Sequence, residues 1–113
     1  MGKSRIESVM EARTQKRKSI AVERALAALR ALERSGARAW VVGSLAKGGF
    51  GLHSDVDLLV ECNEEMESGL FKIVERAMRD FPFHLIPTCA IDDGKLSYFM
   101  KEAVDASGIR ACA

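Results

Sequence analysis

The chain has 113 residues, of which 48% are hydrophobic and 29% are charged, and its formal net charge is +1. A chain of this length forms one compact domain, and a net charge so near zero gives no global sign of a nucleic-acid or membrane binder. No apolar run approaches the roughly 20 residues that span a bilayer, and residues 1–20 lack the apolar core of a signal peptide. These features predict a cytoplasmic protein without a membrane segment.

The first segment is locally basic, although the whole chain is not. Residues 1–19 carry six lysines and arginines against two glutamates and are predicted to form a basic helix or a partly ordered tail before a single domain at 20–113. No aromatic residue is interleaved with these charges. Most such runs are solvated faces, so nucleic-acid binding is not favoured.

Helices and strands then alternate along the chain. Apolar residues recur at three- and four-residue steps over 20–35, which predicts a helix that ends before Gly36. Residues 37–42 and 55–61 are expected to pair as a hairpin, with Trp40 in the core. A helix over 65–80, an edge strand over 83–87 and a last helix over 95–106 complete the pattern, and the order predicts an α+β fold: a small mixed sheet with helices on one face.

The three cysteines lie far apart in the sequence. Cys62, Cys89 and Cys112 are an odd number without a Cys-x-x-Cys pair. This argues against a disulfide framework or a zinc site, and ordinary reduced thiols are expected.

Residues 41–60 combine a glycine-rich loop with two carboxylates. Asp55 and Asp57 alternate with apolar residues, so in a strand both side chains point to the same face, roughly 7 Å apart. Two such carboxylates repel each other unless a cation or proton lies between them, and Mg²⁺ commonly takes one or two protein carboxylates and substrate phosphates. The turn at Gly43 and Ser44, with more glycines behind it, offers backbone N–H groups that a phosphate could approach.

At these residues the chain resembles the nucleotidyltransferase superfamily of DNA polymerase β, and within it the small minimal nucleotidyltransferases. The family signature is Gly-Ser, a loop of about ten residues, and Asp-x-Asp. Here Gly43-Ser44 is followed by residues 45–54 and then by Asp55-Val56-Asp57. The resemblance extends over about residues 20–105 and implies a nucleotidyltransferase-like fold.

The resemblance also implies an activity. Asp55 and Asp57 would bind catalytic Mg²⁺ ions, Gly43 and Ser44 would hold the phosphates of ATP or another nucleoside triphosphate, and Lys47 could reach a phosphate oxygen. An acceptor hydroxyl would attack the α-phosphorus and displace pyrophosphate. Minimal members often work with a small helical HEPN-domain protein in toxin–antitoxin pairs and adenylylate a tyrosine of that partner. The sequence leaves the oligomeric state open, a homo-oligomer included.

One position departs from the family pattern. Members usually place a third carboxylate on the strand after the second helix, where this chain has His84. Imidazole can accept a proton near neutral pH, but it suits Mn²⁺ better than Mg²⁺ as a ligand. Asp92 or Asp93 would supply the acid if that strand extended far enough. The alternative is a catalytically impaired module that binds a nucleotide and acts by capturing its partner.

Overall fold

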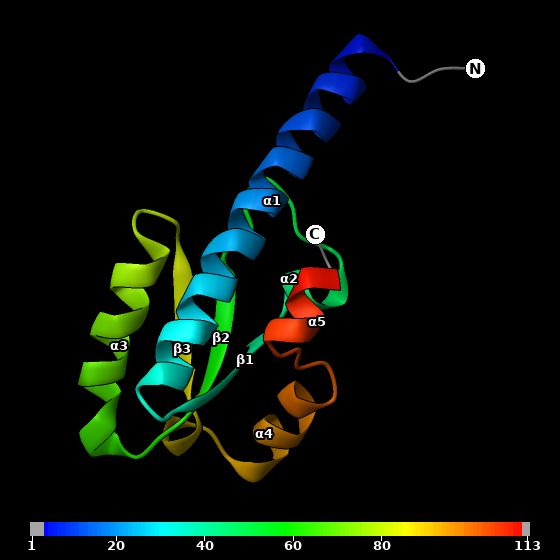
Figure 1. Cartoon of the computed structure of the whole chain (residues 1–113). Helices are drawn as coiled ribbons and strands as arrows, with labels where there is room; N and C mark the ends of the chain where they lie inside the picture. The colour runs from blue at the N-terminus through cyan, green and yellow to red at the C-terminus, as the bar shows by residue number, and fades with distance from the viewer. Residues whose placement is uncertain (1–3, 112–113) are drawn as a thin grey trace.

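A three-stranded sheet lies at the centre of the computed structural model, which describes residues 4–111. The strand order is β1-β2-β3, with β1 antiparallel and β3 parallel to β2. Helices pack against the sheet, which confirms the predicted α+β fold (Figure 1). In chain order the elements are α1 (Arg5–Arg34), β1 (Arg38–Val42), α2 (Ser44–Lys47), β2 (Val56–Glu61), α3 (Glu64–Met78), β3 (Phe83–Pro87), the 3₁₀ turn η1 (Thr88–Ala90), α4 (Asp93–Met100) and α5 (Ala106–Ala111).

The first helix is far longer than the apolar pattern predicted. It begins after Ser4, whose hydroxyl accepts a hydrogen bond from the Glu7 N–H at 3.1 Å, and this cap lets the basic segment continue unbroken into residues 20–34. The predicted boundary between residues 19 and 20 therefore lies inside α1, while residues 1–3 are outside the described residues. The N-terminal half of α1 projects beyond the body of the molecule (Figure 1). Neither α1 nor any other helix within residues 4–111 is long and apolar enough to cross a membrane.

The strands pair as the sequence predicted. β1 and β2 form a hairpin in which Trp40 lies opposite Leu59 and Val42 lies opposite Asp57. β3 is an edge strand, and its register with β2 places His84 beside Asp57. The hairpin connection and the start of β3 therefore meet at one end of the sheet.

Alternation along the strands separates the face that packs against α1 and α3 from the face that carries Asp57 and His84. Val41, Leu58 and Val60 are buried and belong to the same core as the apolar stripe of α1 and three residues of α3. The neighbouring positions, among them Asp57 and His84, point to the other face, because successive side chains of a strand alternate. Helix residues in this core are Ala21, Val22, Ala25, Ala28, Leu29, Leu32, Leu70, Val74 and Met78.

The predicted last helix over 95–106 is wrong in extent. The structure has two helices, α4 and α5, separated by a stretch in which Val104 exchanges both backbone hydrogen bonds with Val41 at 2.9 Å. These bonds pair the outward-facing backbone N–H and C=O of Val41, which a continuous helix over 95–106 would have left without these partners. Asp105 then caps α5 by accepting the Gly108 N–H at 2.9 Å.

Candidate functional site

Three of the predicted site residues lie together where β2 and β3 begin. The His84 Nδ1 is 3.1 Å from the Asp57 Oδ1, and the His84 Nε2 is 3.7 Å from the Asp55 Oδ2. All three side chains reach solvent, His84 most of all at 67% exposure. Asp92 and Asp93 are not on the strand, because Asp92 caps α4 by accepting the Lys95 N–H at 2.8 Å and Asp93 begins that helix.

The geometry of His84 fits a proton-accepting role. At 3.1 Å a neutral ring can donate its Nδ1–H to Asp57, which fixes the tautomer and leaves the Nε2 lone pair available. The 3.7 Å from Nε2 to Asp55 is too long for a hydrogen bond. A carboxylate in this position holds the imidazole in one tautomer and one orientation.

The donor set at this cluster also fits a hard cation. Asp55 and Asp57 supply carboxylate oxygens on one face, and Mg²⁺ typically binds one or two carboxylates and keeps its other positions for water and phosphate. Within the described part of the chain, no three His, Cys, Asp or Glu side chains are arranged to hold a metal ion. The two aspartates can therefore hold a metal only together with oxygens from a substrate or water.

Gly43 connects the end of β1 to this cluster through its backbone. Its φ of 74° and ψ of −152° lie in a region that is essentially restricted to glycine. A methyl group on its Cα would overlap the Asp57 Oδ2 and lie 3.2 Å from the Asp57 Cγ. The missing side chain is what allows the Asp57 carboxylate to lie directly against the loop.

The short helix α2 follows Gly43 and was not predicted. Gly48, with φ of 91°, ends it in the left-handed conformation, and the Gly48 N–H bonds back to the Ser44 carbonyl at 3.0 Å. The Lys47 Nζ is 3.1 Å from the Tyr98 hydroxyl and 3.0 Å from the Glu102 carboxylate. These two partners raise the pKa of Lys47, the Tyr98 hydrogen bond most. Through the same contacts, Lys47 joins α2 to α4 and to the segment that follows α4. Two of the three ammonium donors are therefore engaged, and a phosphate contact would compete with Tyr98 and Glu102 or use the third donor.

Arg17 is a site-supporting residue that the sequence reasoning missed. It lies on α1, where the basic run gave no reason to single it out, yet its Nη2 donates to the Ser54 carbonyl at 2.8 Å. Its guanidinium also lies 4.6 Å from the centre of the Phe81 ring and 5.9 Å from that of Phe50. Arg17 thus holds the loop residue just before Asp55. The signal in the sequence was its spacing of four residues from the buried Ala21, which places Arg17 on the same side of α1 as the buried residues.

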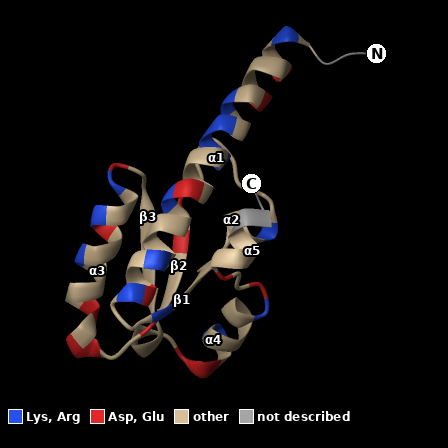
Figure 2. Ribbon diagram, viewed as in Figure 1, with Lys and Arg blue, Asp and Glu red and all other residues tan. Residues whose placement is uncertain are grey.

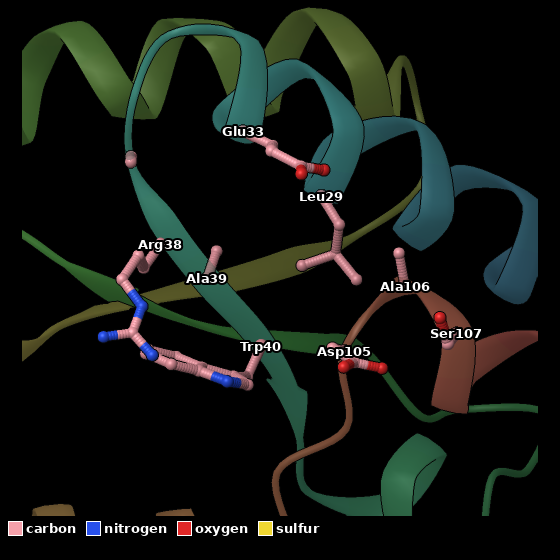
Figure 3. A pocket seen from close by; sticks show the side chains of 9 residues that line it. Leu29, Glu33, Arg38, Ala39, Trp40, Asp105, Ala106 and Ser107 are labelled. Carbon is pink, nitrogen blue, oxygen red and sulfur yellow. The ribbon is translucent and has the colours of Figure 1, made fainter.

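Trp40 is half-buried rather than a core residue, contrary to the prediction. It lines a cavity of about 390 Å³ at the outer edge of β1 (Figure 3). The Arg38 guanidinium lies 5.4 Å from its ring centre, and Glu33 and Asp105 also line this cavity. None of the three clustered site residues borders it, so it is separate from the candidate site.

Comparison with known proteins adds one finding to this geometry. Residues 22–103 match a family model described as a nucleotidyltransferase domain. No match to the chain was found among curated proteins or among solved structures. The matched range contains the whole loop, both aspartates and His84.

Proposed function

Because the chain belongs to the nucleotidyltransferase domain family, we propose that it transfers a nucleoside monophosphate, AMP from ATP, to an acceptor hydroxyl. The observation that carries this proposal is the convergence of Asp55, Asp57 and His84 next to Gly43. Two carboxylates that could hold a metal lie at one end of the sheet, beside a glycine-containing loop whose backbone a phosphate could approach.

Each residue of this cluster has a distinct part in the proposed reaction. Asp55 and Asp57 would hold Mg²⁺ or Mn²⁺, which would stabilise negative charge on the attacking and leaving oxygens. The Gly43 backbone and Ser44 would bind the terminal phosphates. Lys47 would be a further phosphate ligand, in competition with its contacts to Tyr98 and Glu102.

The reaction balances without another reactant. The acceptor oxygen forms a bond to the α-phosphorus, the bond from that phosphorus to the bridging oxygen of the β-phosphate breaks, and pyrophosphate leaves. His84 takes the hydroxyl proton on Nε2 while Nδ1 stays hydrogen-bonded to Asp57.

The proposed acceptor is a protein. We place it on a HEPN-type partner, as the family resemblance implies, in a toxin–antitoxin pair. Incubation with α-labelled ATP, Mn²⁺ or Mg²⁺ and the candidate partner should label the partner. Asp57→Asn should abolish labelling, whereas Asp93→Asn, an exposed aspartate at the start of α4, should leave it unchanged.

His84 also supports a second candidate function. A histidine at the third-strand position weakens a Mg²⁺ site, so the chain would bind its nucleotide and its partner without transferring AMP. The same assay separates the two functions. Partner binding and ATP binding by the wild type, with no labelling in either metal, would establish the binding module and exclude the transferase.

A further inference from the structure

A groove of about 610 Å³ runs between α3 and the free edge of β3. Phe71, Phe83 and Leu85 give it an apolar lining, and the two phenyl rings lie 5.4 Å apart with Phe71 43% exposed. His84 lines the groove as well as the candidate site. An exposed apolar surface that leads directly to reactive side chains is typical of a binding surface.

The edge of β3 that borders this groove has open backbone groups. The Val56 N–H donates to the Pro82 carbonyl at 3.1 Å, and the parallel ladder from that bond turns His84 toward β2. The N–H and C=O groups of Phe83 and Leu85 therefore point outward, and no other described residue bonds to them. The next outward position is Pro87, which has no N–H, so the open edge is short.

We propose that this groove binds an extended segment of an acceptor protein, which joins β3 as a fourth strand. The inference rests on the proposed transferase function, because it names where the acceptor docks. Main-chain hydrogen bonds to Phe83 and Leu85 would supply affinity, and an apolar side chain over Phe71 would supply specificity.

The register of such a strand brings its side chain to the reaction site. Residues directly opposite each other in a ladder share a face, so the segment residue opposite His84 points to the face that carries His84 and Asp57. Neighbouring strands are about 4.8 Å apart, and β3 separates the added strand from Asp57. A tyrosine spans that interval, whereas a serine hydroxyl stays closer to its own strand.

Charge further defines the segment. Acidic residues gather in the first turn of α3 (Figure 2), and Glu64 and Glu67 line the groove at the end far from His84. These carboxylates favour lysine or arginine at one end of the segment and repel a nucleic-acid backbone. Lys72, farther along α3, lines the groove as well and gives it opposite charges along its length.

The first experiment measures docking without catalysis. The full chain carrying Asp57→Asn is mixed with a fluorescent ten-residue peptide that has a central tyrosine, alternating valines and two lysines at one end. We expect saturable binding and slower amide exchange at Phe83 and Leu85, with no change at His84, whose N–H already bonds to β2. A peptide with glutamates in place of the lysines should bind at least about tenfold more weakly. Absence of binding, or unchanged exchange at both outward amides, overturns the proposal.

The second experiment removes single features of the groove. Leu85→Pro deletes an outward N–H but no bond to β2, and Phe71→Lys removes the exposed ring. Each should weaken peptide binding by about tenfold or more, while Met66→Lys, on an exposed part of α3 outside the groove, should change it less than about twofold. If Leu85→Pro does not fold, Phe71→Lys alone decides.

Transfer to the peptide separates this inference from the proposed function. Wild-type protein with α-labelled ATP and Mn²⁺ should label the tyrosine peptide and not a serine version. Intact binding without labelling contradicts the transferase function and leaves the docking groove standing. Labelling that Phe71→Lys and Leu85→Pro do not reduce overturns the groove and leaves the transferase standing.

Discussion

Replacing Gly43 with alanine is expected to cost far more stability than replacing another glycine of the same loop. The backbone at Gly43 lies in a glycine-only region, which costs an alanine about 1–3 kcal/mol. Overlap of the new methyl group with the Asp57 carboxylate adds about 1–3 kcal/mol of overpacking. The expected loss is therefore about 2–6 kcal/mol, a large part of the roughly 5–15 kcal/mol that holds a domain folded.

Gly48 provides the matched control. Its φ is 91°, but no atom lies within 4 Å of the position a Cβ would take, so Gly48→Ala should lose only about 1–2 kcal/mol. Urea unfolding of the variants gives these free energies. Combining Gly43→Ala with Asp57→Ala removes the clashing carboxylate and should recover about 1 kcal/mol or more relative to additivity. Equal losses in the two glycine variants, or strict additivity with Asp57→Ala, would refute the reasoning.

Three further predictions concern the surroundings of the site. Arg17→Met should lower the free energy of unfolding by about 2–4 kcal/mol, because it removes a charged hydrogen bond and cation–π contacts. The control Lys16→Met should change that free energy by less than about 0.5 kcal/mol. Equal losses for the two variants in urea unfolding would contradict this prediction. His84→Asp should raise the ratio of Mg²⁺-supported to Mn²⁺-supported transfer rates, since aspartate supplies the oxygen that Mg²⁺ prefers, and an unchanged ratio argues against a third-ligand position. Burial, and then the neighbouring Cys89, raises the pKa of Cys62 to about 11. The neutral thiol is thus favoured in the folded state, and its contribution to stability, present below pH 9.0, is lost as the pH rises through about 11. At pH 8 iodoacetamide should therefore modify Cys89 faster than Cys62, and peptide mass mapping that finds equal rates would contradict the raised pKa.

The hairpin and its site were predictable because their signals are local. Alternation of apolar and acidic residues at Asp55 and Asp57 gives a strand whose polar face is defined within a few residues. The position of His84 was implied by the family resemblance, and the register beside Asp57 agrees with it. Its chemical part in the site stays a prediction.

Other features depend on contacts between distant residues and left weak signals in the sequence. Arg17 is one of several cations on α1, and only the fold brings it to the Ser54 carbonyl. Val104 continues an apolar helical pattern, but its bonds to Val41 break the helix. Two other features have local signals in the sequence: Ser4 and Glu7 have the spacing of a capping box, and Gly48 marks the end of α2.

The projecting half of α1 has a consequence for how the molecule loses structure. Starting a helix is the costly step and extending it is not; here the buried half of α1 supplies the start, so the exposed turns near Arg5 extend a helix that already exists. Such turns open from their free end, and amide exchange should slow steadily from Arg5 toward Arg17, whose guanidinium is bonded to the Ser54 carbonyl. Because that bond also holds Ser54, opening of α1 as far as Arg17 would release the loop of the candidate site.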